Sequence, residues 1–306
     1  MGKVLVIRGG ALGDFILTLP AIRLLSEGLD SAQIHILGYS PMIQLATLAG
    51  LAVETRRIEH TPLARFFVPN AALDDEWQRY FASFDVIISY LHDPEGIFRA
   101  NLLRSGVKET NLYEGIHQVV DDPDHGHAVH QLARILESLA LYLIHPSATL
   151  NLKNDKLSGI AIHPGSGAVW KNWPPKRWLD LLPELRQRLA TDESLIVISG
   201  EAEEAWIDNF IAEANSIAAP VQHWRNLPLE TLAQNLANVR AFIGHDTGVS
   251  HLAAAAGAPT FALFGATNPR IWAPLGDNVR VIRTDDDKLL SITPVMILNN
   301  LDAAKI

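Results

Sequence analysis

Cysteine is absent from all 306 residues of this sequence. The absence excludes disulfides, cysteine-ligated zinc, iron–sulfur clusters and a cysteine nucleophile, and it is typical of a cytoplasmic protein. The sequence also lacks a run of about 18 apolar residues that could span a membrane, and its N-terminus lacks the apolar core and cleavage site of a signal peptide. We therefore expect a soluble cytoplasmic protein whose contact with a membrane surface is at most peripheral.

Positive charge is scarce, with 25 Lys and Arg against 34 Asp and Glu, a formal net charge of −9. This balance argues against a nucleic-acid-binding protein, although it leaves room for a local basic site around an anionic ligand. Hydrophobic residues make up 48% of the chain, which is ordinary for a globular protein. The length predicts about two domains.

Strand-like and helix-like segments alternate along the whole chain, which is typical of doubly wound α/β domains. We place the linker at His145–Asp155 and expect Rossmann-like domains at residues 1–150 and 151–306; residues 56–75 look irregular, and Pro20 should kink or delay the first helix. The expected strands are Lys3–Ile7, Gln33–Leu37, Asp85–Tyr90, Gly159–Ile162, Leu195–Ser199, Ala241–Gly244, Thr260–Phe264 and Val279–Ile282. The expected helices are Asp14–Leu25, Pro41–Leu48, Ala128–Leu141, Pro175–Leu189, Ala202–Ala214, Leu229–Leu236 and Val249–Ala256.

The first glycine-rich loop, residues 8–14, follows the first expected strand, where parallel sheets bind their ligands. It does not match a dinucleotide fingerprint, because Arg8 stands at the first glycine position and the second strand ends without a carboxylate. Asp14 marks a helix start, so it is either a helix N-cap or a catalytic base. The two roles compete, since a cap hydrogen bond lowers the basicity of a carboxylate.

The second glycine-rich loop, residues 163–175, also lies between a strand and a helix. Gly165 and Gly167 allow backbone N–H groups to face an anion, Ser166 adds a hydroxyl and Lys171 adds a positive charge. The spacing fits neither a P-loop nor a nucleophile elbow. The loop therefore predicts an anion site of another kind.

Two tryptophans of this loop, Trp170 and Trp173, are candidates for a stacking platform. The alternative is that they cover the edge of the domain. We favour that alternative for Trp173.

The third loop, residues 244–251, again follows a strand and opens a helix. Asp246 or Thr247 can cap that helix, whose free N–H groups and dipole attract anions. Ser250, His251 and Asp246 are the residue types of a hydrolase triad, but adjacent helical residues do not face each other. His251 is either a ligand contact or a residue that satisfies a buried helix end.

Three acidic stretches follow other expected strands or precede expected helices. Residues 200–204 contain Glu201, Glu203 and Glu204, which are typical of a first helical turn and are also candidates to bind ribose hydroxyls. The stretches at residues 117–130 and 285–287 contain possible metal ligands. Their spacing matches no metal motif, so we interpret them as a solvated loop and a surface turn.

Taken in order, these motifs resemble the pattern of glycosyltransferase family 9, whose best-known members are the ADP-heptose:lipopolysaccharide heptosyltransferases. The resemblance extends over nearly the whole chain. It is carried by Gly13-Asp14, Leu19-Pro20, His163–Ser166, Lys171-x-Trp173-Pro174 with Trp178, Asp246–Gly248 with Ser250-His251, and Phe264-Gly-x-Thr267.

The resemblance implies a GT-B architecture, in which two Rossmann-like doubly wound domains face an interdomain cleft. It implies an inverting, metal-independent transfer that uses no cofactor. The N-terminal domain would bind a saccharide or lipid-linked saccharide acceptor, and the C-terminal domain would bind a nucleotide sugar, ADP-heptose foremost. The acceptor would be lipopolysaccharide core or a related saccharide, and a cytoplasmic protein could meet it at the cytoplasmic face of the inner membrane.

The resemblance also assigns roles to individual residues. Asp14 matches the base, Lys171 matches the lysine that stabilises the leaving group, and Arg8 and Gly13 match acceptor-side positions. The donor-side positions are Ser166, Gly167, Glu204, Asp246, Thr247, Gly248 and His251. Glu204 matches the ribose-binding acid by spacing, while Glu201 and Glu203 remain alternatives. Two other functions stay open, a GT-B transferase with a different donor and a nucleotide-sugar-binding protein without transfer activity.

Overall fold

The computed structural model describes residues 2–153, 159–218 and 220–306. It divides into two units, Met1–Pro146 and Ser147–Ile306. The expected boundary followed residue 150; of the expected linker, Asn154 and Asp155 lie outside the described residues. Among the described residues, no helix is long and apolar enough to cross a membrane.

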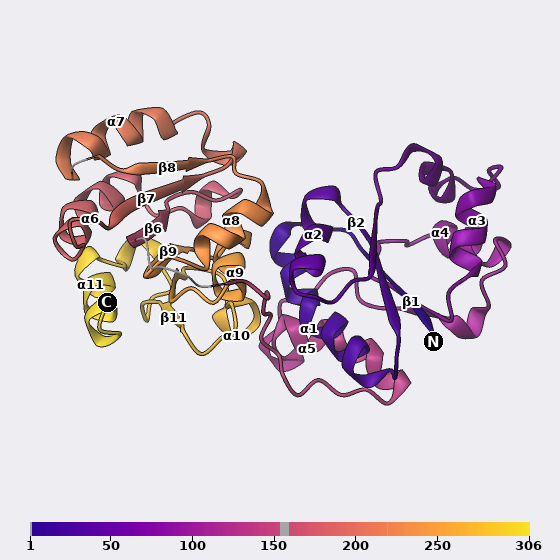
Figure 1. Cartoon of the computed structure of the whole chain (residues 1–306). Helices are drawn as coiled ribbons and strands as arrows, with labels where there is room; N and C mark the ends of the chain where they lie inside the picture. Colours follow the sequence, from indigo (N-terminus) through magenta and orange to yellow (C-terminus); the bar gives the residue numbers. More distant parts are fainter. Residues whose placement is uncertain (1, 154–158, 219) are drawn as a thin grey trace. The chain divides into compact units, whose positions relative to one another are not determined.

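The first unit is built around a parallel five-stranded sheet (Figure 1). The strands lie in the order β3 (Glu54–Arg57), β2 (Gln33–Gly38), β1 (Lys3–Arg8), β4 (Val86–Ser89) and β5 (Leu112–Glu114). In the central strands β1 and β2, every residue after the first is buried. Short β-branched runs of this kind suit a parallel sheet that is covered on both faces.

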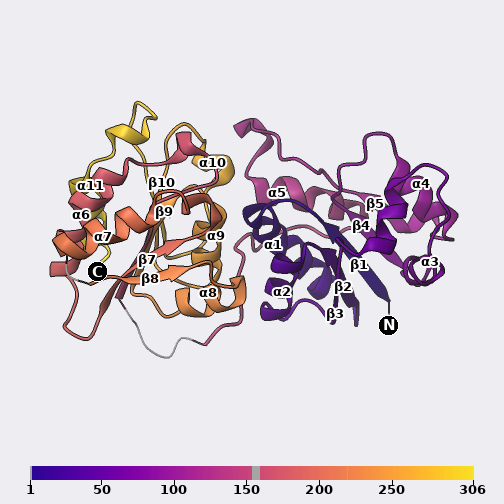
Figure 2. The same cartoon turned by 90° about the horizontal axis from the view of Figure 1, so that it is seen from above.

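Helices cover both faces of the first sheet (Figure 2). On one side lie α1 (Leu12–Gly28), α2 (Ser40–Leu48) and α5 (Ala128–Ala133), and on the other lie α3 (Asp75–Ala82) and α4 (Ile97–Arg104). Trp77 and Phe81 of α3 and Phe98 of α4 pack with Ile7 and Ile87 of the sheet to form an aromatic-rich core. These side chains fill the space between the sheet and helices α3 and α4.

The second unit contains a six-stranded parallel sheet. Its order is β11 (Val279–Ile282), β10 (Thr260–Leu263), β9 (Ala241–His245), β6 (Gly159–His163), β7 (Ser194–Ser199) and β8 (Gln222–Arg225). On one face lie α6 (Pro175–Gln187), α7 (Ile207–Ala218) and α11 (Pro294–Ala303). On the other lie α8 (Leu229–Leu236), α9 (Gly248–Ala255) and α10 (Pro269–Trp272).

Each sheet has one point at which the direction of strand addition reverses. This reversal, the switch point of the sheet, falls between β1 and β4 in the first unit and between β6 and β9 in the second. Ligands of open α/β sheets bind beyond the carboxyl ends of the strands at such a point. The loop after β1, and the two loops after β6 and β9, occupy these positions, and they are the three glycine-rich loops of the sequence.

Most expected strands and helices are present, but several expectations were wrong. Helix α1 begins at Leu12 and contains Pro20, so Pro20 does not delay its start. The expected helix 128–141 changes to a 3₁₀ helix at Arg134–Leu139, and the expected helix 202–214 begins only at Ile207. The segment expected to be irregular includes the end of edge strand β3 and a 3₁₀ helix at Thr61–Phe67. Strands β3, β5 and β8 and helices α3, α4, α10 and α11 were not predicted.

Candidate active site

The loop after β1 places a carboxylate at the first turn of α1. Asp14 is the third residue of that helix, and Asp14 Oδ2 accepts a hydrogen bond from the backbone N–H of Ala11 at 3.0 Å. Asp14 is therefore not the N-cap, which is Ala11, but it supplies half of a capping box. Gly10 has a φ of +96°, and a Cβ there would lie 3.0 Å from Asp14 Oδ2, so glycine leaves the space that this arrangement needs.

Arg8 lies behind this carboxylate. Its guanidinium is 3.7 Å from Asp14 Oδ1, with the Arg8 side chain 2% exposed and the Asp14 side chain 38% exposed. Arg8 also donates to the carbonyl of His117 at 3.4 Å and lies against the ring of Tyr90. Burial lowers the pKa of Arg8, and the charge of Asp14 partly opposes that shift. Arg8 therefore backs Asp14 from inside the unit, whereas Gly13 belongs to the first turn of α1.

Ser166 forms hydrogen bonds within the loop after β6. Ser166 is buried, its hydroxyl lies 2.7 Å from the carbonyl of Ala168 and 2.6 Å from Asn172 Oδ1, and it accepts from the N–H of Ala168. These contacts hold the turn that contains Gly167. Ser166 thus shapes the backbone of the predicted anion loop in this structure.

Lys171 and Asp246 bring the loops after β6 and β9 together. Lys171 Nζ lies 2.7 Å from Asp246 Oδ2, with the lysine side chain 26% exposed and the aspartate side chain 9% exposed. Asp246 directly precedes Thr247, the backbone N-cap of α9. The ammonium therefore lies beside the positive end of that helix, and both favour an anion.

A histidine that sequence reasoning did not single out joins the same two loops. His245, at the end of β9, is fully buried; its Nε2 accepts from the backbone N–H of Trp173 at 2.8 Å, and its Nδ1 lies 3.3 Å from the carbonyl of Gly165. Burial lowers the pKa of His245 to about 3, so the ring is neutral. Its position directly before Asp246 was the only available sequence signal. Trp173 is itself fully buried and belongs to the hydrophobic core of the second unit.

The acidic group after β7 separates into a buried and an exposed part. Glu203 is 1% exposed, accepts from the backbone N–H of Gly200 at 2.7 Å and lies 3.6 Å from His163 Nε2. Burial opposes ionisation of Glu203, but the hydrogen bonds from His163 and Gly200 outweigh it and lower the pKa of the carboxyl. Within the described residues Glu203 Oε1 has no hydrogen-bond partner, and a Cβ at Gly165 would collide with it.

Glu204, the residue favoured by spacing, lies elsewhere. It is exposed and accepts a hydrogen bond from Asn226 at 3.2 Å. Glu203 is therefore the acidic residue that the structure brings to the loop after β6.

The start of α9 contains the remaining predicted residues. Thr247 and Gly248 form the helix start, and Thr247 Oγ1 is buried without a hydrogen-bond partner in the described part of the chain. His251 is buried on the same helix. Ser250 donates to the carbonyl of His245 and is thereby held by the backbone, which argues against a hydrolase triad.

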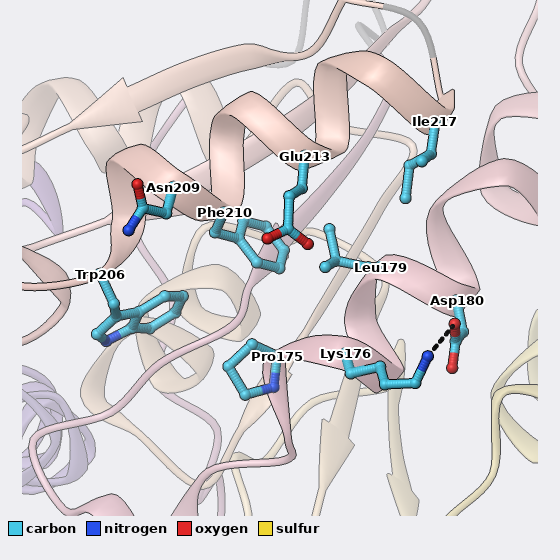
Figure 3. A pocket seen from close by; sticks show the side chains of 9 residues that line it. All are labelled: Pro175, Lys176, Leu179, Asp180, Trp206, Asn209, Phe210, Glu213 and Ile217. Atoms are coloured by element: carbon cyan, nitrogen blue, oxygen red, sulfur yellow. Dashed lines mark ion pairs between the residues drawn. The ribbon is translucent and has the colours of Figure 1, made fainter.

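A pocket of about 520 Å³ lies between α6 and α7 (Figure 3). Trp206, Phe210 and Leu179 form its apolar part, and Lys176 pairs with Asp180 at its rim. Its lining contains none of the predicted site residues. The pocket is therefore separate from the candidate site at the loops after β6 and β9.

No group of three or more His, Asp or Glu side chains able to hold a metal is found among residues 2–153, 159–218 and 220–306. Two Rossmann-like units with glycine-rich loops at the switch points of their sheets are typical of α/β proteins that bind nucleotides. A model of glycosyltransferase family 9 (heptosyltransferase) matches residues 133–293, more than half of the chain. The chain belongs to this family, and the protein is a glycosyltransferase.

Relatives of this chain are lipopolysaccharide heptosyltransferases. Lipopolysaccharide heptosyltransferase 1 of Pseudomonas aeruginosa is 25% identical over 312 aligned positions, which cover 90% of this chain and 81% of the relative. Lipopolysaccharide heptosyltransferase 2 of Escherichia coli is 30% identical over 151 positions, which cover 42% of this chain and 43% of the relative.

Solved structures share the fold over almost the whole chain. The ADP-heptose lipopolysaccharide heptosyltransferase II of E. coli has a TM-score of 0.74 at 18% identity and 98% coverage of both chains. The E. coli heptosyltransferase WaaC solved with ADP has a TM-score of 0.75 at 17% identity, covering 98% of this chain and 99% of that one. The fold is thus the GT-B fold of these enzymes.

Proposed function

We propose that this protein transfers heptose from ADP-heptose to a saccharide acceptor of the lipopolysaccharide core. The observation that carries the proposal is the Lys171–Asp246 pair, which places an accessible ammonium at the start of α9 and at the switch point of the second sheet. The names of the relatives support the donor and the acceptor, because they are lipopolysaccharide heptosyltransferases and neighbours were solved with ADP and an ADP-heptose analogue.

On the donor side, the diphosphate binds at the loops after β6 and β9. The backbone around Gly167, the α9 start at Thr247 and Gly248, and the Lys171 ammonium together favour the negative charge. That charge grows as the glycosidic bond to the diphosphate breaks, so a fixed cation stabilises the transition state more than the ground state. Glu203 replaces Glu204 as our candidate for the ribose, since it lies against the loop after β6.

On the acceptor side, Asp14 is the proposed base. The acceptor hydroxyl gives its proton to the carboxylate, its oxygen attacks the anomeric carbon, and the bonding electrons leave with ADP. Attack from the face opposite the diphosphate inverts the anomeric configuration. Asp14 suits this role because its carboxylate is 38% exposed and is fixed by Ala11 and Arg8.

We further propose that the transfer is independent of metal ions. Lys171 and the N–H groups at the α9 start supply the positive charge that a divalent cation would otherwise supply. The proposed location is the cytoplasm, with peripheral contact at the cytoplasmic face of the inner membrane, where a lipid-linked saccharide acceptor would be met.

The test is a thermal-shift series with ADP, UDP and GDP and their sugars, followed by product analysis with a lipopolysaccharide-core acceptor. ADP and ADP-heptose should stabilise the protein, by about 2.7 kcal/mol at 100 times the dissociation constant. Transfer should continue in EDTA. Stabilisation by UDP or GDP alone would indicate a different donor, binding without transfer would indicate a non-catalytic protein, and activity lost in EDTA and restored by Mg²⁺ would contradict metal independence.

A further inference from the structure

One tryptophan of the second unit differs from all the others in its environment. Trp170 is 64% exposed, whereas the other six tryptophans are buried or half-buried. It lies in the short 3₁₀ helix Val169–Lys171, next to the proposed leaving-group lysine. Tryptophan is enriched at binding interfaces, because its ring buries a large apolar area and its N–H group can still find a polar partner.

Trp170 forms one wall of a narrow cavity at the carboxyl edge of the sheet. The other walls come from Lys171, Asp246, Leu289 and the loop Gly265–Thr267 after β10. Lys171 Nζ lies 5.3 Å from the centre of the indole ring and 2.7 Å from Asp246 Oδ2. The cavity thus combines an aromatic ring, a cation and a carboxylate within the reach of one small ligand group.

The strand order gives a direction to a bound nucleotide sugar. Along the edge, the loops follow the order β10, β9, β6 and β7. On the proposed function, the diphosphate lies at β9 and β6 and the ribose lies toward Glu203, beyond β7. The transferred sugar, on the opposite side of the diphosphate, must then lie toward β9 and β10, which is the side of the Trp170 cavity.

We propose that Trp170 is a specificity-determining residue whose indole ring packs against the transferred sugar. The inference rests on the proposed function and adds a residue to it. The C–H groups on one face of a sugar ring carry partial positive charge and match the negative face of an aromatic ring. The cavity itself, about 10 Å³, has room for one small polar group, so a single sugar hydroxyl reaches toward Asp246 while the sugar ring lies against the exposed face of Trp170.

The test compares the affinities of wild type and Trp170→Ala for ADP and for ADP-heptose by calorimetry. ADP lacks the sugar, so its dissociation constant should change less than about twofold, whereas that of ADP-heptose should rise about three- to tenfold. Trp170→Phe should restore most of the loss. Val169→Ala is the matched control, because Val169 is 85% exposed in the same short helix and does not line the cavity.

Two results would overturn the inference while leaving the proposed function intact. One is an unchanged affinity of Trp170→Ala for ADP-heptose. The other is an equal loss for ADP and ADP-heptose, which would place the ring at the nucleotide or make it a structural support of the loop. A wild-type protein that binds neither ligand would instead contradict the proposed function itself.

Discussion

Each unit places an acid–base pair at its switch point, and the two pairs have opposite polarity. In the first unit the cation, Arg8, is 2% exposed and the carboxylate, Asp14, is 38% exposed. In the second unit the carboxylate, Asp246, is 9% exposed and the cation, Lys171, is 26% exposed. The buried partner holds its neighbour, and the accessible partner faces the solvent.

The difference in exposure is the physical basis of the two roles that we propose for these pairs. An accessible carboxylate backed by a cation can accept a proton from a hydroxyl. An accessible ammonium backed by a carboxylate can meet a developing anion. The proposed base, Asp14, and the proposed leaving-group cation, Lys171, are thus each the more exposed partner of their ion pair.

The comparison is tested most strongly at Asp14. Asp14→Asn keeps the size of the side chain and an oxygen that can accept from Ala11, but it removes the basic oxygen. We expect the transfer rate to fall about 10²–10⁴-fold, with ADP affinity and melting temperature close to wild type. Asp74→Asn is the matched control, because Asp74 caps α3 in the same unit through the N–H groups of Glu76 and Trp77. A near-normal rate in Asp14→Asn would make Asp14 a structural cap only.

Substitution of Lys171 tests the ion pair of the second unit, in which the cation is the more exposed partner. Lys171→Ala removes the cation from the leaving group, so turnover should fall about 10²–10³-fold. Since the change also leaves Asp246 without its ammonium, stability should fall modestly, and Lys171→Ala combined with Asp246→Asn should recover stability without activity. Lys176→Ala, at an exposed lysine of α6, is the control in steady-state assays. Wild-type turnover in Lys171→Ala would show that the exposed cation has no part in the reaction.

His245, the buried histidine that joins the loops after β6 and β9, should make the protein less stable in acid. His245 has a pKa of about 3 in the folded state because it is buried, whereas an unfolded histidine titrates near pH 6.5. Between these values the unfolded state binds the extra proton, so stability is lost as pH falls, by about 1.4 kcal/mol per unit. The measurement is urea unfolding at pH 6.5 and 4.5.

Wild type should lose about 2–3 kcal/mol more than His245→Gln between these two pH values. The variant is less stable at neutral pH, but the difference in pH dependence does not depend on that offset. Equal pH dependence in the two proteins would show that His245 is not the group responsible.

The smallest effect is expected for Glu203 and Glu204, the neighbouring acidic residues after β7. Glu203→Gln removes the charge that meets His163 inside the unit, so the free energy of unfolding should fall by about 1–3 kcal/mol, and ADP should bind more weakly. Glu204→Gln should change neither property measurably, because Glu204 is exposed and contacts only the surface residue Asn226 among the partners described for it. The opposite ranking in ADP binding would return the ribose role to Glu204.

Elements whose sequence has a clear local pattern were predictable from the sequence. The β-branched runs of β1, β2, β6 and β7, and the glycine-rich loops that follow β1, β6 and β9, depend on local spacing and composition. Strand β8 was not predictable, because its polar sequence Gln222–Arg225 becomes a strand only by pairing with β7. The helix expected at 202–214 begins only at Ile207, and here too contacts with distant residues matter, because Glu203 contacts His163 and the backbone N–H of Gly200.

By itself, the sequence determined the α/β class and the positions of the three glycine-rich loops after β1, β6 and β9, because each of these depends on the order and spacing of neighbouring residues. Only the tertiary structure decided which charged residue of each pair is exposed, that His245 joins two loops 80 residues apart, and that Glu203 rather than Glu204 reaches the loop after β6. Burial and pairing of charges depend on what packs against a side chain from distant parts of the chain, and local spacing contains no record of it.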